Sequence, residues 1–465
     1  MTAAAPPSTG TQRRLLAAAV LASFVSFLDG SIVNIALPAI DRDLGGGVVT
    51  QQWVVDGYLL AVSAFILLSG AVSDRFGRLR VLRIALVAFA ATSLLCAVAP
   101  TAGVLIGARV LQGVAGALLV PGSLGLIIAV FEGPAQAKAI GSWTGWTSVS
   151  MLFGPVVGGL LVDQLGWRSV FLIGLLPAAG SMLLLRRDRD AAHDGTPARI
   201  DLLSAALTAL GLGALTVGLI EIGGGRNAAL PTAASVALLA VGAVLVVAFL
   251  LRNRRVPHPL VPPDLFRARN FTAGNGATLF VYGALGLASL VPAVYIQQVL
   301  GLSATAAALI GLPSTILMIL LSGRFGALAG RFGPRAFMTA GPVVAAAGAL
   351  VWACVGLVPA SGGGRVVLVA VGMIVLGLGI ATTVAPLTAA VLGAVPESES
   401  GIGSAVNNAV ARVAGLMTTA TVGLILGGAV DTPGFVRVAA VVAALMVVGG
   451  LISFAGIRNR RPTAS

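Results

Sequence analysis

The sequence predicts an all-α protein that crosses a membrane many times. Hydrophobic residues make up 57% of the 465 residues and charged residues only 10%, and the mean hydropathy is +1.01. Soluble domains carry about 25% charged residues. Apolar runs of roughly 18 or more residues, each long enough to cross the hydrocarbon core as a helix, recur from Leu15 to Ile457. The runs are continuous and do not alternate, which excludes a transmembrane β-barrel.

Fourteen such runs follow one another along the chain. We expect the spans at residues 15–37, 52–72, 81–99, 103–130, 137–162, 168–185, 202–222, 231–251, 271–299, 304–328, 336–358, 365–392, 402–429 and 435–456. An even number places both termini on one side of the membrane. Residues 11–22 resemble a signal peptide, but the apolar run continues beyond any cleavage site, so we interpret it as the first span.

The arginines orient the spans, because short cytoplasmic loops carry an excess of positive charge. The chain has 28 Arg and one Lys, Lys138. The first side has many arginines: Arg13, Arg14, Arg75, Arg78, Arg80, Arg83, Arg186, Arg187, Arg189, Arg199, Arg252, Arg254, Arg255, Arg267, Arg269, Arg331, Arg335, Arg458, Arg460 and Arg461. The opposite loops hold only Arg42, Arg168, Arg226, Arg365 and Arg437. Both termini are therefore expected in the cytoplasm. The net charge of +13 reports topology, not nucleic-acid binding, and the short loops leave no room for a soluble catalytic domain.

An internal repeat divides the chain into two halves. "GAVSDRFGRLR" begins at Gly70, after the second span, and "GALAGRFGPR" begins at Gly326, after the tenth. Parallel repeats of this kind occur in one large transporter fold. We expect a six-helix bundle over residues 1–190, an inserted two-helix hairpin over 191–256, and a second six-helix bundle over 257–465.

Several motifs resemble those of the major facilitator superfamily. The loop at Gly70–Arg80 is similar to the signature between its second and third spans. "RVLQGVAGALLVPGS" (Arg109–Ser123) resembles its span-4 motif, and "GPVVGG" (Gly154–Gly159) resembles the antiporter motif of exporters. "LDGSIVNIALP" (Leu28–Pro38) and "WVVDGYLL" (Trp53–Leu60) resemble the fourteen-span drug:proton antiporter branch of QacA- and EmrB-type pumps.

The resemblance implies roles for two groups of residues. The expected cytoplasmic gate motif is Gly70, Asp74, Arg75, Gly77 and Arg78. In it we expect Asp74 to cap or pair with a helix end and the arginines to bridge the two halves, although they also set topology. The expected antiporter motif is Gly154, Pro155, Gly158 and Gly159. Small residues at i and i+4 allow close helix packing, and a proline can bend the helix.

Three charged residues lie in the outer half of the membrane by their depth in the spans: Asp29, Asp56 and Arg109. If the first, second and fourth spans pack together as in the family fold, these charges meet at one cavity. Buried charges are tolerated when they pair or face water, so we expect the acids to carry protons and Arg109 to couple protonation to conformation. A fixed ion pair that only joins helices is the alternative. Glu221 is a further candidate for coupling, although its place at the end of a span favours the outer interface.

Other polar residues leave alternatives open. Asn407, Asn408 and Arg412 either bond neighbouring helices or gate the inner mouth. Cys96 and Cys354 lie in apolar runs, so we expect buried thiols without a disulfide. Spans 9–14 contain no acid, although some relatives carry acids there that are associated with dicationic substrates. Broad dication specificity is therefore not expected.

The sequence excludes several classes of protein. No P-loop is present, because Lys138 is followed by Ala139, and neither a zinc-binding H-E-x-x-H nor a G-x-S-x-G elbow occurs. We expect no enzyme activity, no metal and no cofactor, and nothing indicates a channel filter. The expected function is a proton-coupled exporter of amphipathic drug-like molecules in the plasma membrane, a monomer whose partners are lipid, protons and a small-molecule substrate. An exporter of a single metabolite or antibiotic is the alternative, and a non-transporting sensor of the same fold is a more remote one.

Overall fold

The computed structural model describes residues 9–186, 201–225, 228–256, 259–359, 363–396 and 399–459, and these residues form helices and connecting turns. The first group of helices is α1 (Thr9–Leu44), α2 (Gly47–Phe76), α3 (Arg78–Ala97), α4 (Ala102–Val130), α5 (Gly133–Leu165), α6 (Ser169–Leu172) and α7 (Leu175–Leu185). A pair follows, α8 (Leu202–Gly223) and α9 (Thr232–Asn253). The last group is η2 (Pro263–Arg267), α10 (Arg269–Gln298), α11 (Ala304–Phe332), α12 (Pro334–Ala353), η3 (Cys354–Leu357), α13 (Gly364–Leu392), α14 (Ser400–Ala420), α15 (Val422–Leu426) and α16 (Thr432–Gly456).

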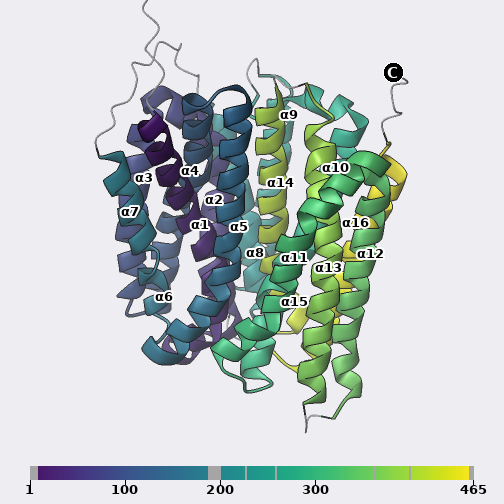
Figure 1. Ribbon diagram of the computed structural model, residues 1–465. Helices are drawn as coiled ribbons and strands as arrows, with labels where there is room; N and C mark the ends of the chain where they lie inside the picture. The colour runs from purple at the N-terminus through teal and green to yellow at the C-terminus, as the bar shows by residue number, and fades with distance from the viewer. Residues whose placement is uncertain are drawn as a thin grey trace, which may run out of the picture.

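Each expected span corresponds to one of these helices or to a broken pair of them. Twelve of the described helices are long and apolar enough to cross a membrane, a set that includes neither α2 nor the interrupted segment Ser169–Leu185. Figure 1 shows the helices running side by side along one direction, with α1–α7 on the left and α10–α16 on the right. The described ends of the chain lie at the same end of the molecule, at the top of this view.

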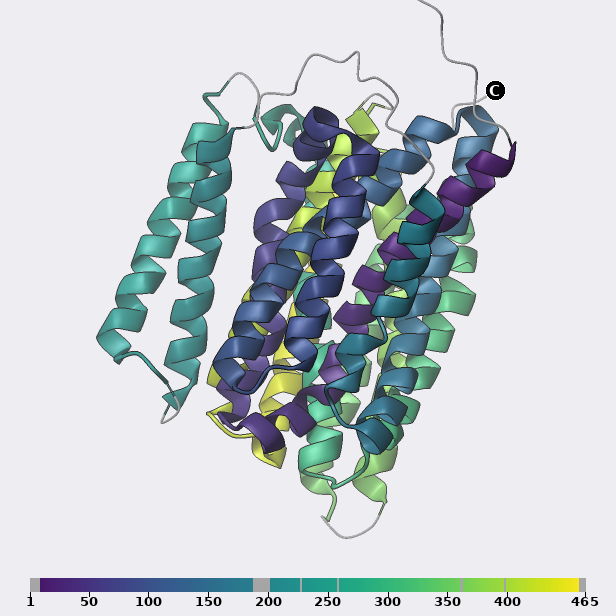
Figure 2. The same cartoon turned by 90° about the vertical axis from the view of Figure 1, so that its left-hand side faces the viewer.

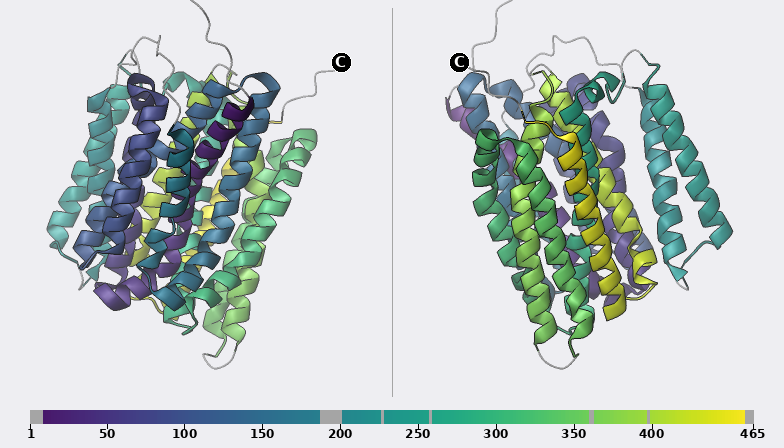
Figure 3. Two further views of the ribbon diagram at one scale, coloured as in Figure 1. Left: turned by 60° about the vertical axis from the view of Figure 1, so that its left-hand side comes forward. Right: turned by 90° about the vertical axis from the view of Figure 1, so that its right-hand side faces the viewer.

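The α8–α9 pair stands at the edge of the molecule (Figure 2), and a second pair of views shows the same separation from both sides (Figure 3). Helix α8 contacts both groups, since it packs against α2, α14 and α15. A Cβ on Gly223 would lie 2.6 Å from the backbone nitrogen of Leu424, so this glycine permits a close backbone contact with the last group. The pair therefore covers the junction between the two groups of helices at one edge.

The expected span 168–185 is interrupted, and this is a correction to the sequence analysis. Helix α6 ends at Leu172 and α7 begins at Leu175. Pro177 lies in the first turn of α7 and has no N–H to donate to the carbonyl of Ile173, so the helical hydrogen bonding cannot run continuously through this segment. The break brings Phe171 and the turn after it against the centre of the first group of helices.

The repeated loop has the same geometry in both halves. Gly77 ends α2 with φ 92°, and Gly333 ends α11 with φ 89°. Both values lie in the region that favours glycine, which accounts for glycine in the two copies. The preceding side chains also correspond, because Arg75 lies over the Phe76 ring and Arg331 over the Phe332 ring, at 5.6 and 5.7 Å. The repeat seen in the sequence is therefore also a repeat of local structure.

The two cysteines have different surroundings. Cys96 is buried in α3, as expected, and both thiols are free. Cys354 is exposed, so the prediction of a second buried thiol is wrong. The apolar run extends beyond the packed part of α12, and Cys354 opens the 3-10 turn η3 that ends it.

Candidate functional site

A buried ion pair joins α1 and α4. Arg109 Nη1 donates a hydrogen bond to Asp29 Oδ2 at a distance of 2.7 Å. The Arg109 and Asp29 side chains are 2% and 6% exposed. The Arg109 guanidinium also lies 4.5 Å from the centre of the Tyr58 ring of α2 and 5.8 Å from that of Phe171. Charges within a membrane are tolerated when they pair, so this geometry accounts for both residues. Asp29 and Arg109 meet, as the sequence predicts.

Polar neighbours extend the pair across four helices. Gln112, one turn after Arg109, accepts from Arg109 Nη1 at 2.6 Å and donates to Asp29 Oδ1 at 3.2 Å. It also donates to Ser93 Oγ of α3 at 2.8 Å, and Arg109 Nε donates to the Val54 carbonyl of α2 at 2.9 Å. The sequence analysis missed Gln112 and Ser93. The signal for Gln112 was present, because residues at i and i+3 share a helix face.

Asp56 does not join this pair. It is fully buried in α2, and its Oδ1 accepts a short hydrogen bond from Thr419 of α14. Its Oδ2 has no hydrogen-bond partner among the residues that the structure describes. Two residues within one turn of α2 therefore serve different neighbours, since Asp56 bonds the last group of helices while the Tyr58 ring lies against Arg109. The expectation of one pocket holding all three charges is corrected to a pair and a separate acid.

The expected antiporter motif brings α5 into contact with both groups of helices. A Cβ on Gly154 would lie 2.0 Å from Ser31 Oγ, and one on Gly158 would lie 2.4 Å from Ile32 Cγ1, so α5 packs tightly on α1 just beyond Asp29. A Cβ on Gly159 would lie 2.7 Å from the Thr305 Cα of α11. Pro155 lies inside α5, where it removes a backbone donor.

Hydrogen bonds between the two groups gather at the end of the molecule away from the described chain ends. Gln52 of α2 donates to the carbonyls of Thr419 and Ala420, at 2.9 and 3.0 Å. Asp163 of α5 accepts from the first backbone N–H groups of α11, those of Ala304 and Thr305, at 3.1 and 2.9 Å. Gln297 of α10 donates to the Ile35 carbonyl of α1 at 3.1 Å. The first group of helices thus supplies caps to the ends of two helices of the last group, α11 and α14.

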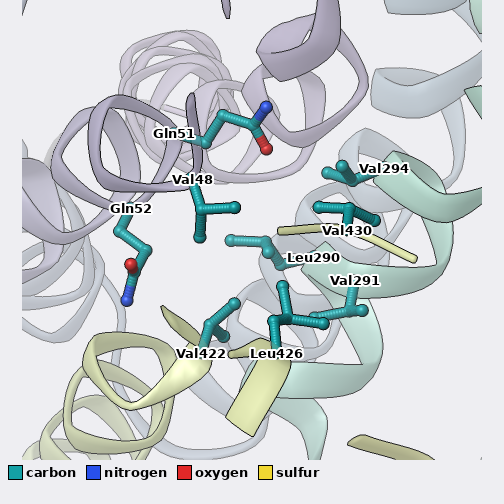
Figure 4. Close-up of a pocket in the computed structure, with 9 residues that line it drawn as sticks. All are labelled: Val48, Gln51, Gln52, Leu290, Val291, Val294, Val422, Leu426 and Val430. Atoms are coloured by element: carbon teal, nitrogen blue, oxygen red, sulfur yellow. The ribbon is translucent and has the colours of Figure 1, made fainter. Parts of the chain in front are cut away.

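A small apolar pocket lies in this closed region (Figure 4). Side chains from α2, α10 and α15 surround it, and Val48 points toward Leu290 across the pocket. Its lining residues are Val48, Gln51, Gln52, Leu290, Val291, Val294, Val422, Leu426 and Val430. The packing between the groups at this end is therefore mainly apolar, with Gln52 at its edge bonded to α14.

The expected gate motif lies at the other end, beside the end of α4. Arg78 Nη1 donates to the Gly125 carbonyl at 2.8 Å, so it contacts its own group of helices. Arg75 is exposed and lies over the neighbouring Phe76 ring. Among the described residues Arg75 makes no contact with the other half, and the bridging role expected of these arginines stays a prediction. The surroundings of Gly70 and the side chain of Asp74 lie outside the described part of the structure.

Glu221 has a local role in the structure. Its Oε2 accepts from the backbone N–H groups of Ala229 and Leu230, at 2.6 and 2.9 Å, and so holds the turn between α8 and α9. Glu221 is 7% exposed, lies at the end of α8, and belongs to a different helix from either member of the Asp29–Arg109 pair. These contacts give Glu221 a structural role in the turn, and its expected part in coupling stays a prediction.

The polar residues of α14 divide into two sets. Asn407 donates to Asn275 Oδ1 at 3.1 Å and to Thr278 Oγ1 at 2.8 Å, both in α10. Arg412 lies with its guanidinium carbon 5.9 Å from the centre of the Phe27 ring of α1, in the other group of helices. Of the two interpretations left open, bonding to a neighbouring helix is therefore correct for Asn407.

Comparison with known proteins supports the same fold and family. The model of the family described as "Major Facilitator Superfamily" matches residues 19–419. A protein named "Probable actinorhodin transporter" from Streptomyces coelicolor is 34% identical over 439 residues, which cover 92% of this chain and 74% of that protein. The "Multidrug efflux pump LfrA" of Mycolicibacterium smegmatis is 32% identical over 427 residues, covering 90% and 82%.

The fold is also similar to solved structures. A crystal structure of a D-xylose-proton symporter superposes with a TM-score of 0.70 at 14% identity, and covers 97% of this chain and 99% of that one. At this identity the likeness concerns the fold alone. Together with the family match over residues 19–419, it shows the fold of the chain. The chain is therefore a member of the Major Facilitator Superfamily, a family of multi-pass membrane transporters rather than enzymes, as its sequence motifs predict.

Proposed function

We propose that this protein is a proton-coupled exporter of amphipathic, drug-like molecules that works by alternating access. The observation that carries the proposal is the buried ion pair between Asp29 and Arg109 inside the first group of helices. An acid held within the membrane by an arginine is a site where gaining a proton changes the balance of charge. Relatives named for drug efflux and antibiotic transport support export as the direction.

The proposed topology has fourteen spans with both termini in the cytoplasm of a plasma-membrane protein. Residues 1–190 and 257–465 form the two moving bundles, and residues 191–256 form the inserted hairpin. The position of both described chain ends at one end of the molecule supports this assignment (Figure 1). The end closed by Gln52 and Asp163 then faces outward, and the molecule is in a state closed to the outside.

Protonation and the opening of the outer side are linked through two acids in this proposal. A proton that reaches Asp29 neutralises the partner of Arg109 and weakens the bond between α1 and α4. Asp56 bonds Thr419 in the other bundle only while the bundles are together at this end. Release of these contacts allows the two bundles to separate at the outward-facing end. When the contacts form again, this end closes. The protein acts as a monomer, and its partners are lipid, protons and a small molecule, with no nucleic acid.

An exporter dedicated to one compound is the second candidate. It is favoured by relatives named for a single antibiotic, among them the actinorhodin transporter and the "Tetracenomycin C resistance and export protein" of Streptomyces glaucescens. A panel of fluorescent dyes and antibiotics separates the two candidates. Efflux of several unrelated compounds supports the first, and efflux of one compound supports the second.

Reconstitution into liposomes with an imposed pH gradient tests the proposal. We expect substrate to move against its concentration gradient when the gradient is present and to stop when an ionophore collapses it. Transport that ignores the gradient would contradict proton coupling. No movement of any compound in the panel, from protein that remains folded by size-exclusion chromatography, would contradict export.

A further inference from the structure

Arg412 is a cation near the middle of the bundle that no side chain of the described protein neutralises. It lies twelve residues into α14, which at about 1.5 Å per residue places it roughly 18 Å from the start of the helix. Among the described residues it makes neither a hydrogen bond nor an ion pair, and its one ring contact is with Phe27 of α1. An arginine inside a membrane protein is costly unless it finds a partner.

The surrounding fold directs Arg412 toward the space between the two groups of helices. Thr419 lies two turns further along α14 on the same face, and it bonds Asp56 of α2. Asn408 lies one turn before Arg412 on this face, is half-buried, and has no hydrogen-bond partner in the part of the chain described. The face defined by Asn408, Arg412 and Thr419 is therefore turned to the opposite group of helices.

Phe27 of α1 contacts this cation, and tyrosines of two further helices lie near it. Besides Phe27, the hydroxyls of Tyr58 in α2 and Tyr282 in α10 lie close enough to interact with its charge. The Tyr282 hydroxyl, like Asn408, has no hydrogen-bond partner among the described residues. The Tyr58 hydroxyl is already hydrogen-bonded to the Ser26 hydroxyl at a distance of 3.0 Å.

Nearby acids do not neutralise Arg412. Asp29 is bonded to Arg109 and Gln112, and Asp56 to Thr419. Helices α10–α16 contain no Asp or Glu at all. Among the described residues, the region between the two groups therefore offers an arginine without an ion-pair partner, two half-buried polar side chains without hydrogen-bond partners, and aromatic rings. The last group of helices supplies no acid there, and the one carboxylate oxygen without a partner, Asp56 Oδ2, belongs to α2.

We propose that Arg412 binds the acidic group of an aromatic anion, such as a carboxylate or phenolate, and makes this anion the preferred substrate class. Asn408 and the Tyr282 hydroxyl supply further hydrogen bonds, and the rings of Phe27 and Tyr282 contact the aromatic part of the ligand. The chemistry is that of a charge-assisted hydrogen bond combined with ring contacts. The proposal rests on the export function proposed above, which it deepens by naming the substrate class.

Binding of three matched probes to the full chain in nanodiscs tests this proposal. Naphthoate, naphthalenemethanol and naphthylmethylammonium share a ring system and are an anion, a neutral alcohol and a cation. We expect isothermal titration calorimetry to give a Kd for naphthoate roughly tenfold lower than for naphthylmethylammonium, as expected for one charge-assisted hydrogen bond. Empty nanodiscs measure partition into lipid.

Variants test whether the preference for naphthoate depends on Arg412. Arg412→Gln should lose the roughly tenfold preference for naphthoate and leave naphthalenemethanol unchanged, whereas Arg412→Lys should keep the preference. Arg254→Gln removes the same charge from an exposed position beyond α9 and should change nothing. If Arg412→Gln fails to fold, binding of the three probes to the natural protein and to Arg412→Lys still shows whether the anion is preferred.

The outcomes separate this inference from the proposed function. Equal binding of the three probes, a preference for the cation, or no binding of naphthoate by the natural protein would overturn the inference. An equal loss of all three probes in Arg412→Gln would also overturn it, because that result indicates a structural role or a partner for Asp29 or Asp56. Binding is measured without a gradient, so failure of proton-driven transport would leave this result standing and would count against the proposed function alone.

Discussion

Asp29 and Arg109 meet at a place where each charge depends on the other for stability. Removing one partner of a buried pair leaves the other uncompensated, which costs about 3–5 kcal/mol in soluble proteins. Gln112 and the Val54 carbonyl share the guanidinium, so the site keeps some of its hydrogen bonds when the acid becomes neutral. We expect this arrangement where a side chain changes its charge during the transport cycle while the protein stays folded.

We predict that Asp29→Asn abolishes transport driven by a pH gradient, because the amide cannot take up and release a proton. The measurement is substrate movement in liposomes with and without the gradient. Asp43→Asn is the matched control, since Asp43 bonds Arg168 in an exposed pair whose side chains are 46% and 44% exposed. Gradient-driven transport by Asp29→Asn at the level of this control would remove Asp29 from the mechanism.

The pairing of Asp29 with Arg109 was predictable from the sequence, and the position of Asp56 was not. The depth of a residue in the membrane follows from its position along its span. The sequence therefore places Asp29, Asp56 and Arg109 at a similar depth. Which neighbour each side chain faces depends on contacts between helices far apart in the chain. Asp56 and Thr419 are brought together only by packing of α2 against α14, and no local pattern around either residue signals it.

Helix ends at the closed side depend on residues of the opposite group. The first N–H groups of an α-helix lack partners within the helix, and Asp163 of α5 supplies them for α11. The last carbonyls lack partners too, and Gln52 of α2 supplies them for α14. A change in either capping residue therefore acts on the contact between two groups of helices as well as on one helix.

We predict that Asp163→Ala shifts the protein toward a state open at this end, because a lost helix cap costs about 0.5–2 kcal/mol. Pulsed electron paramagnetic resonance between spin labels on α5 and α11 should show a larger share of long distances. Asp431→Ala is the control. Asp431 caps α16 within its own group of helices, through the Gly434 N–H at 2.6 Å. A distance distribution unchanged by Asp163→Ala, or changed equally by Asp431→Ala, would contradict the prediction.

We predict a similar shift for Gly159→Ala, on steric grounds. The added Cβ would meet the Thr305 Cα at 2.7 Å and the Ala304 carbonyl oxygen at 2.9 Å, and backbone atoms cannot turn away as a side chain can. A cysteine placed at Val48, inside the closed region, should react faster with a membrane-impermeant maleimide in this variant. Gly107→Ala has open space around its Cβ and should leave the rate unchanged. Equal rates in both variants would show that α5 and α11 tolerate the methyl group.

Most helices were predictable because apolar runs and charged loops define a span, whereas their internal breaks depend on finer signals. Pro177 is such a signal, and it marks the interruption between α6 and α7. Cys354 shows the opposite case, because hydropathy does not distinguish the packed part of α12 from the exposed turn that follows. The repeat at Gly77 and Gly333 was readable because a positive φ restricts the residue type.

Alternating access requires the whole molecule to hold two arrangements of similar free energy. The closed end is held by a few hydrogen bonds, close glycine contacts and the small apolar region around Val48 and Leu290. Such contacts form and break as a unit, because they join two bodies at the same end. The α8–α9 pair lies beside this junction, and α8 contacts both α2 and α14, so the pair is attached to both groups of helices (Figure 2).

The orientation of the whole molecule can be tested with Cys354. This exposed thiol lies in η3, which is expected at the outer end, and Cys96 is buried. We predict that a membrane-impermeant maleimide labels Cys354 on intact cells. In a Cys354→Ser background, a cysteine replacing the exposed Arg75 should be labelled only after the membrane is permeabilised. The Cys354→Ser protein alone should remain unlabelled. The reverse pattern would place the arginine-rich loops outside and invert both the topology and the direction of transport proposed for the closed state.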